Sequence, residues 1–421
     1  MGQVKILLAT DSYHSYPTAN GICVEEIADE LLKQNFEVHI LCFRHEKENI
    51  EDICNGIYIH KINMDIVNKL RFKYEKNPKS KKSLILKKIM ITINRIQAVL
   101  FIHWFPLRNP LFCSRYLKKM KKLQKQYKYD IIIGSYCPFE AAYAVSRIKE
   151  NDNVVTGLYC LDSFTNLKKR FFMTVDFQDK RAWKWEKLFF EKSDFIINLN
   201  CHREHYKKER YKVFSDKMYL SDIPHIIKRN YYNSEEKENQ NEDKIRILYA
   251  GALRDELIKP LLEYLEPFLC EKYIYLDIYG RSTGEFFDKY CTDNVREQIH
   301  MKGFVQHDEI IRQEYSSDIL LSLGNSNTDF IPSKIFEYIS LGKKILHIYS
   351  YSKDSALQYY EKYNNCCCIN INDDSEYNKK LIKDFLKKPE RKISFEEIEN
   401  IFIQNTPGFT VDIIKKYIKK K

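Results

Sequence analysis

The stretch Asp318–Leu346, DILLSLGNSNTDFIPSKIFEYISLGKKIL, decides the fold of this chain. It predicts an apolar strand over Ile319–Leu323, a polar loop, a helix that Pro332 opens and Gly342 ends, and a second strand from Ile345. Proline in a first helical turn and glycine after a last turn are start and stop signals, because proline loses no hydrogen bond there and glycine accepts a left-handed backbone. A strand, a helix and a returning strand indicate a sheet covered by helices.

The predicted helix in this stretch has an apolar face and a polar face. The side chains expected in the core are Ile335, Phe336 and Ile339. Lys334, Glu337 and the start of the helix then face the loop. The first backbone N–H groups of a helix have no partner within it, and together with the helix dipole they favour phosphate. We therefore expect the backbone N–H groups of Ser333 and Lys334 to bind phosphate.

Two acidic residues of this stretch, Asp329 and Glu337, lie eight positions apart, and the helix reads PSKIFEY before a Leu-Gly-Lys-Lys turn. In these features the sequence resembles the retaining GT-B glycosyltransferases of the family-4 type, also called glycosyl transferases group 1. Those enzymes carry an acidic residue, seven others and a glutamate in a strand, loop and helix of this kind. The alternative is an ordinary helix on which Glu337 is a solvated surface charge.

Two other segments carry the same resemblance in the same order along the chain. Residues 18–41, TANGICVEEIADELLKQNFEVHIL, are similar to the family's opening unit, with Gly21 in the small-residue loop before the first helix. Residues 301–323, MKGFVQHDEIIRQEYSSDILLSL, are similar to a run in its C-terminal domain. The resemblance implies an α/β protein of the GT-B fold, in which two Rossmann-like domains face a central cleft and a C-terminal helix crosses back to the N-terminal domain.

The chain, at 421 residues, is long enough for two domains that each have a core. We expect an N-terminal, acceptor-binding domain over 1–227, a linker over 228–244, a nucleotide-sugar-binding domain over 245–395 and C-terminal helices over 396–421. The linker prediction rests on composition, since KRNYYNSEEKENQNEDK is polar, acidic and without an apolar period.

Composition excludes several classes of protein. A hydrophobic content of 44% and an aromatic content of 14% indicate a globular chain. The twelve cysteines show no zinc-ligand spacing and predict reduced thiols of a cytosolic protein. The opening MGQVKILLAT lacks the regions of a secretory signal, and nowhere do apolar residues run on for the length of a membrane span. We therefore expect neither a signal peptide nor a transmembrane helix.

The net charge of +11 comes from one region, residues 66–128, which holds eighteen lysines and arginines against one acidic residue, Glu75. Trp104 and Phe105 follow an apolar stripe in this region. The stripe consists of Ile89, Ile93, Ile96 and Leu100. A basic amphipathic segment with interfacial Trp and Phe is typical of a helix that lies on an anionic membrane. The alternative is a helix pair packed on the N-terminal domain whose lysines face water, and we do not expect nucleic acid as a partner.

The resemblance places a diphosphate-binding loop after the first strand of the C-terminal domain, at Gly251, Arg254 and Lys259. The family's usual arginine after the glycine is Ala252 here, so we expect Arg254 to replace it. Positive charge at this place stabilises the leaving diphosphate as the glycosidic bond breaks. The alternative is that Arg254 and Lys259 are surface charges.

Other roles follow from the resemblance alone. It implies that Glu337 accepts hydrogen bonds from ribose hydroxyls, that Asp329 contacts the transferred sugar, and that the backbone at Phe304 and Val305 holds the base. With the base bound by main-chain groups, the sequence does not specify which base it is.

Two elements that such enzymes often carry are absent from the sequence. The family's histidine after the fourth strand is missing from the loop GSYCPFEAA, so Tyr136 or Glu140, or neither, contacts the sugar. No Asp-x-Asp follows a strand, and we expect no metal cofactor, with Arg254 and Lys259 supplying the positive charge instead.

The sequence thus predicts a metal-independent, retaining hexosyltransferase that uses a nucleotide-diphosphate sugar and a saccharide or lipid-linked acceptor. We expect it at the inner face of the membrane, in surface polysaccharide or glycolipid synthesis. The alternatives are a non-catalytic membrane-binding protein with this fold, a sugar-nucleotide epimerase, and a phosphorylase. An epimerase needs more acid and base residues in the cleft, and a phosphorylase needs a cofactor-lysine motif that we do not find.

Overall fold

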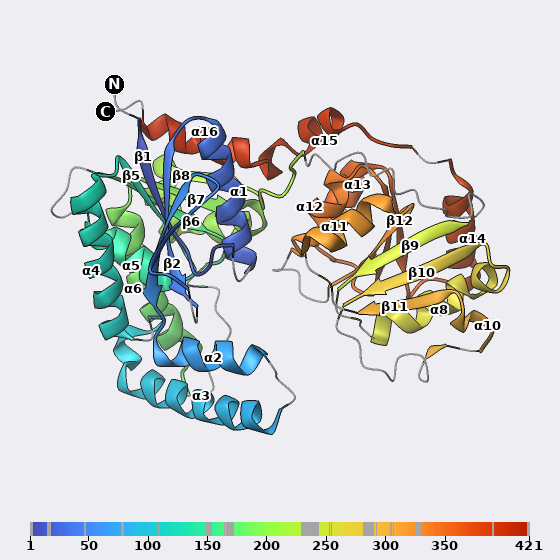
Figure 1. The fold of residues 1–421 in the computed structure, drawn as a ribbon, viewed down its shortest axis with the longest axis horizontal. Coiled ribbons are helices and arrows are strands. Elements are labelled where there is room, and N and C mark those ends of the chain that lie inside the picture. Colours follow the sequence, from blue (N-terminus) through green and yellow to red (C-terminus); the bar gives the residue numbers. More distant parts are fainter. Residues whose placement is uncertain are drawn as a thin grey trace. The chain divides into compact units, whose positions relative to one another are not determined.

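The computed structural model is shown in Figure 1. It describes residues 3–14, 18–45, 48–76, 80–107, 109–148, 154–163, 165, 172–228, 244–251, 253, 255–280, 290–291, 293–303, 305, 307–325, 331–389 and 391–418. The chain forms two compact units, Met1–Pro224 with Pro407–Lys421, and His225–Thr406. Each unit has one sheet with helices on both faces, so the predicted α/β fold with two Rossmann-like domains is confirmed. The expected linker, 228–244, lies almost wholly outside the described residues.

The sheet of the first unit has eight strands in the order β3-β4-β2-β1-β5-β6-β7-β8. All neighbours pair in parallel except β3 and β4. The strands are β1 (Lys5–Ala9), β2 (Glu37–Arg44), β3 (Glu51–Cys54), β4 (Ile57–Asn63), β5 (Ile131–Ser135), β6 (Val155–Cys160), β7 (Phe195–Leu199) and β8 (Met218–Ser221). Central strands such as β5 are buried along their whole length because helices cover both faces.

The helices of the first unit form two layers. In Figure 1, α4, α5 and α6 lie on one face of the sheet, and α1 and α16 lie on the other. The helices are α1 (Ala19–Lys33), α2 (Ile66–Lys76), α3 (Lys81–Leu100), α4 (Pro110–Tyr127), α5 (Phe139–Ile148), α6 (Val175–Lys192), α7 (Arg203–Tyr206) and α16 (Pro407–Ile418), with 3-10 turns η1 (Ile102–Trp104), η3 (Asn200–His202) and η4 (Glu209–Lys217).

Helix α16 is part of the first unit although it follows the second unit in the sequence. Its Thr410 hydroxyl lies 3.0 Å from the Ser221 hydroxyl of β8, and the ring of Tyr417 stacks on that of Phe195 in β7. Lys415 donates a hydrogen bond to Gln34, next to α1. The helix therefore closes one face of the sheet.

The second unit has a six-stranded parallel sheet in the order β11-β10-β9-β12-β13-β14. Its strands are β9 (Ile245–Ala250), β10 (Ile274–Tyr279), β11 (Ile299–Gly303), β12 (Ile319–Leu323), β13 (Lys344–Tyr349) and β14 (Cys366–Asn370). Its helices are α8 (Asp255–Cys270), α10 (Asp293–Arg296), α11 (His307–Ser316), α12 (Lys334–Ser340), α13 (Leu357–Tyr363), α14 (Ser375–Lys387) and α15 (Phe395–Ile401), with the turn η5 (Ile403–Asn405).

The stretch that decides the fold forms β12, α12 and β13, as predicted. The three side chains expected in the core are buried. Gly342 follows α12 with a φ of +70°, and a Cβ there would lie 2.4 Å from the Ile393 carbonyl oxygen. This turn therefore accepts only glycine, which explains why the helix ends at this position.

The basic region, residues 66–128, differs from the expectation in two ways. Trp104 and Phe105 are not interfacial: Phe105 is buried, and the ring of Trp104 lies 5.2 Å from that of Trp185 in the first-unit core. Helix α4 also packs into this core through one apolar face. Helix α4 is thus packed on the domain, and membrane binding by the basic region stays a prediction. No residue of α2 or α3 belongs to the described core cluster of this unit.

A buried ion pair joins the strands of the second unit to α11. Arg246 of β9 donates from Nε to Asp277 of β10 at 2.8 Å, and its two terminal nitrogens donate to Gln313 and Ser316. Both charged side chains of the pair are nearly inaccessible to solvent. Breaking such a pair leaves a charge in the core without its counter-charge.

We expect Asp277→Ala to lower the free energy of unfolding by about 3 to 5 kcal/mol, because the Arg246 guanidinium then stays buried and uncompensated. Asp179→Ala breaks the partly exposed pair with Arg210 and should cost about 1 kcal/mol or less. Urea unfolding of both variants measures the difference. Equal losses would contradict a special role for the buried pair.

Candidate functional site

Three charged side chains of the second unit meet at the start of α12. Lys334 of α12 lies 2.7 Å from a carboxylate oxygen of Glu314 of α11 and 3.1 Å from one of Glu337. The Glu314 side chain is fully buried, whereas Lys334 and Glu337 are partly exposed. The lysine thus holds the carboxylate of Glu337 in place from one side, and its own charge is shared between two acids.

The electrostatics of this cluster are unequal for its two acids. Burial, together with the neighbouring charge of Glu337, raises the pKa of Glu314 to about 9. Burial alone would lower the pKa of Lys334, but the two carboxylates raise it. Burial thus favours the neutral form of Glu314, and the two carboxylates favour the charged form of Lys334.

Glycines end the three strands on one side of this sheet. Gly251 follows β9, Gly280 follows β10, and Gly303 ends β11. A Cβ on Gly280 would lie 2.2 Å from the Gly251 carbonyl oxygen, so no side chain fits there. Val305, two positions after Gly303, is among the described residues. The carboxyl edge of this part of the sheet therefore presents backbone groups, which is what close approach of a ligand phosphate or base requires.

Four predicted site residues either lie outside the described residues or have an exposed side chain. Arg254, Asp329 and Phe304 lie outside the described residues. Lys259 is exposed on the first turns of α8. The predicted phosphate, sugar and base contacts of these residues stay predictions.

The loop after β12 has an anchor in the structure that the sequence did not predict. Asp354 accepts hydrogen bonds from the backbone N–H of Asn325 at 2.6 Å and from that of Ala356 at 2.8 Å. Its other neighbour is His347 of β13, 3.7 Å away, whose pKa burial lowers to about 4. Gly324 makes room for this carboxylate, because a Cβ there would lie 2.5 Å from it. A lone aspartate thirty residues beyond the strand gives no sequence signal for this role.

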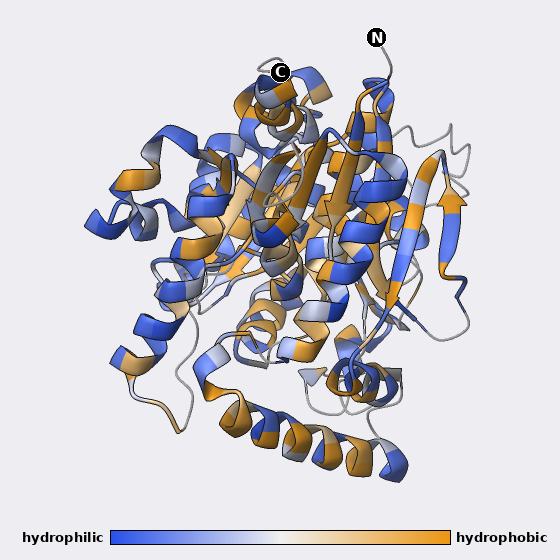
Figure 2. Ribbon diagram, turned by 90° about the vertical axis from the view of Figure 1, so that its left-hand side faces the viewer, coloured by the Kyte–Doolittle hydropathy of each residue, from blue (hydrophilic) through white to orange (hydrophobic). Residues whose placement is uncertain are grey.

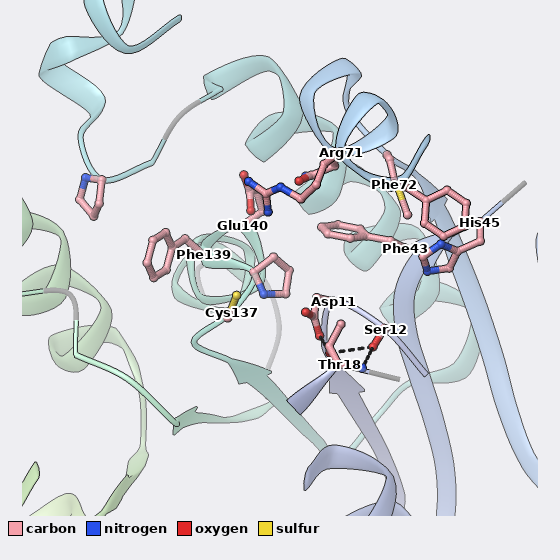
Figure 3. A pocket seen from close by; sticks show the side chains of 14 residues that line it. Asp11, Ser12, Thr18, Phe43, His45, Arg71, Phe72, Cys137, Phe139 and Glu140 are labelled. Atoms are coloured by element: carbon pink, nitrogen blue, oxygen red, sulfur yellow. Dashed lines mark hydrogen bonds between the residues drawn. The ribbon is translucent and has the colours of Figure 1, made fainter. Parts of the chain in front are cut away.

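The first unit contains a cavity of about 310 Å³ at the carboxyl ends of β1, β2 and β5, which we call the first-unit cavity. Figure 3 shows Asp11, Ser12 and Thr18 on one side of it, and Arg71 of α2 and Glu140 of α5 extended toward one another on the other side. The aromatic rings that line it belong to Phe43, Phe72 and Phe139. Carboxylates beside aromatic rings suit a ligand that has both hydroxyl groups and apolar faces.

The predicted opening motif forms one wall of this cavity. Thr18 caps α1 by accepting from the N–H of Gly21 at 3.0 Å, and it donates to Asp11 at 2.9 Å. A Cβ on Gly21 would lie 2.3 Å from the Ser12 hydroxyl, so glycine is needed where the loop meets the helix. Burial raises the pKa of Asp11 against these hydrogen bonds.

Of the two residues proposed to replace the family's histidine, only one is accessible. Tyr136 is buried, and its hydroxyl donates to the buried carboxylate of Glu186 at 2.9 Å. It therefore cannot contact a sugar. Glu140 lines the first-unit cavity.

Comparison with known proteins identifies the fold. No protein-family model and no curated protein matches the sequence. Sucrose-phosphate synthase from Thermosynechococcus elongatus is similar in structure over 100% of both chains, with 13% identity and a TM-score of 0.61. The chain has the GT-B fold. WaaG, a glycosyltransferase involved in lipopolysaccharide biosynthesis, is similar over 97% of this chain and 99% of that one, with 12% identity and a TM-score of 0.53.

The GT-B fold alone does not decide the reaction. A UDP-N-acetylglucosamine 2-epimerase is also similar, over 100% of this chain and 95% of that one, with 12% identity and a TM-score of 0.57. Transferases and an epimerase thus share the arrangement, and the function must be argued from the residues of the site.

The raised pKa of Glu314 makes stability depend on pH. A carboxyl group whose folded pKa of about 9 exceeds its unfolded value adds stability at low pH and loses it as the pH rises toward 9. Because glutamine does not titrate, the Glu314→Gln variant should gain stability relative to the wild type between about pH 5 and 9, by at most about 1.4 kcal/mol per unit.

Urea unfolding at pH 5, 7 and 9 measures this difference. Glu309→Gln, which changes a partly exposed glutamate on the same helix, is the matched control. A difference for Glu314→Gln that does not change with pH would show that Glu314 is ionised in the folded protein.

Proposed function

We propose that this chain is a retaining glycosyltransferase that takes its sugar from a nucleotide-diphosphate sugar. The observation that supports the proposal is where the predicted donor-binding segments lie in the second sheet. Strand order in the second sheet reverses between β9 and β12, and open α/β sheets bind ligands at the carboxyl ends of strands where the order reverses. Gly251 follows β9, and the loop to Lys334 and Glu337 follows β12, so both predicted donor-binding segments start at this point.

Each part of the donor then has a chemically suitable partner. Glu337 accepts from the ribose hydroxyls, and Lys334 holds its carboxylate in place. Arg254 and Lys259, with the backbone N–H groups of Ser333 and Lys334, bind the diphosphate without a metal ion. The remaining contacts are Asp329 with the transferred sugar, the backbone of Phe304 and Val305 with the base, and the glycine-lined backbone at Gly251 and Gly21 with the substrates.

The first-unit cavity is the proposed acceptor site. Its carboxylates and aromatic rings suit a saccharide or lipid-linked acceptor, whose reacting hydroxyl Asp11 or Glu140 would orient. We propose surface polysaccharide or glycolipid synthesis at the cytoplasmic face of a membrane as the setting. The second candidate is a sugar-nucleotide epimerase, which the similar epimerase structure supports.

Replacing Glu337 with Ala should weaken nucleoside diphosphate binding about ten- to hundredfold, because a charge-assisted hydrogen bond to ribose is lost. A thermal-shift screen of nucleoside diphosphates identifies the base, and calorimetry in EDTA then gives the affinity. Glu361→Ala, an exposed acid on the nearby helix α13, is the control and should bind as the wild type does. Equal affinities for wild type and Glu337→Ala would rule out the ribose role.

The products separate transfer from epimerisation. A retaining transferase releases sugar to water or to an acceptor with the donor's anomeric configuration. An epimerase that removes a proton from a ring carbon introduces deuterium there in D₂O, and its product is still a nucleotide-sugar. Proton NMR of the identified donor with the enzyme in D₂O distinguishes the two reactions, and deuterium uptake without sugar release would refute the transferase.

Helix α3 supplies the surface that we propose lies on a membrane. Six of its apolar side chains are between 44% and 70% exposed, and five of the six recur at helical spacing. These five residues, which we call the α3 stripe, are Ile85, Ile89, Ile96, Val99 and Leu100. Figure 2 shows this long helix, with hydrophobic and hydrophilic residues in alternation, at the lower edge of the first unit. No described helix is long and apolar enough to span a membrane.

Exposed positive charges border the α3 stripe. They are Lys81, Lys82, Lys88 and Arg95. The helix sequence contains no acidic residue. Each basic residue near an anionic surface contributes about 1 kcal/mol, and the apolar side chains add a contribution that salt does not screen. Charge complementarity therefore favours an anionic lipid surface over water.

Binding of the protein to phosphatidylglycerol vesicles should fall steeply with salt without vanishing, and neutral vesicles should bind poorly. Charge reversal of Lys81, Lys82 and Lys88 should remove the part of vesicle binding that depends on salt. The double substitution Ile89→Asn with Ile96→Asn should remove the part that does not. Co-sedimentation measures both. Lys118→Glu with Lys122→Glu, on the core-packed helix α4, is the control and should change binding less. Wild type that stays in the supernatant at low salt would refute the membrane surface.

A further inference from the structure

A second hollow lies beside the first-unit cavity and has a different chemical character. Its volume is about 360 Å³, and we call it the α2 hollow. Arg44 at the end of β2 and Lys69 and Lys73 of α2 line it, with His45 and Asn63. None of the described residues that line it is acidic. One guanidinium and two ammonium groups thus line the same hollow.

The spacing of side chains along a helix explains why α2 lines two cavities. Lys69 and Lys73 are four positions apart and lie on one face, whereas Asn68 and Arg71 point to the first-unit cavity. Phe72 separates the two faces and lines both spaces, and its ring lies 4.6 Å from that of His45. The two spaces therefore adjoin at this pair of rings.

Among the described residues, the acidic side chain of Glu48 lies next to the end of β2 and is already engaged. Glu48 accepts from the backbone N–H of His45 at 2.8 Å and lies 3.5 Å from Lys61. Its backbone carbonyl accepts from Nε of Arg44 at 2.8 Å, which fixes the guanidinium at the rim of the α2 hollow. A guanidinium held by Nε still has two terminal nitrogens to donate, in the fork that matches phosphate oxygens.

We propose that the α2 hollow binds a phosphate ester group of the acceptor, while the acceptor's hydroxyl-bearing end lies in the first-unit cavity. This proposal rests on the proposed function, since it defines the class of acceptor. A phosphate group carries more charge and more acceptor oxygens than a carboxylate. It therefore complements a guanidinium and two ammonium groups better. Phe72 and the apolar residues beside it contact the carbon chain that joins the phosphate to the sugar.

The test uses the full chain with labelled histidine, because the His45 ring reports on the α2 hollow itself. His45→Gln assigns its NMR signals. Glycerol 1-phosphate should shift them in a saturable way at fixed ionic strength, and glycerol should not. Lys69→Gln with Lys73→Gln should weaken this binding about tenfold or more. Lys118→Gln with Lys122→Gln removes the same charge from α4 and should leave it unchanged.

Two further probes identify the source of the phosphate. Inorganic phosphate that binds in place of glycerol 1-phosphate would overturn the assignment to an ester, and phosphatidylglycerol vesicles that shift His45 would support a lipid-borne ester. No response to either ester, or an equal response to acetate, overturns the proposal. Nucleoside diphosphate affinity and its dependence on Glu337 are measured separately, so failure of the donor site and failure of the α2 hollow are distinguishable.

Discussion

Parallel pairing is the constraint on which the rest of this structure depends. β9 pairs with β12 in parallel, with Leu248 opposite Leu320, so both strands end at the same edge of the sheet. On one side of this pair lie β10 and β11, and on the other lie β13 and β14, so the strand order reverses here. Loops that are seventy residues apart in sequence are thereby brought together without any contact between their own side chains being needed. The first unit uses the same principle, where the ends of β1, β2 and β5 meet around the first-unit cavity.

The sequence predicted the fold and the stretch from β12 to β13 well because every local signal there agrees. Apolar runs, the Pro-Ser start and the Gly342 turn all demand the same elements. β3 was missed, although Asn55 and Gly56 both have positive φ in the turn to β4 and Asn-Gly is a strong hairpin signal. The strand is exposed along most of its length, so it lacked the apolar alternation on which strand prediction depends.

Contacts between residues far apart in the sequence determine the positions of side chains that local sequence patterns did not predict. Trp104 looked interfacial because it ends an apolar helix stripe, but its partner Trp185 lies eighty residues away on α6. Tyr136 likewise follows a strand, as sugar contacts do, yet its hydroxyl binds Glu186 in the core. The cluster at Glu314 and the loop anchor at Asp354 also join elements that are distant in sequence. Local periodicity shows which face of an element is apolar, and it does not show which neighbour covers that face.

The position of α16 has a consequence for how the protein is made. The first unit consists of residues from both sides of the second unit, and Thr410, Tyr417 and Lys415 contact β8, β7 and the end of α1. During synthesis, the ribosome therefore finishes the whole second unit before it delivers the helix that covers one face of the first sheet. The second unit can fold as a continuous piece, while the nascent first unit keeps apolar surface open. Chaperones that hold unfinished domains would act on this chain at that face.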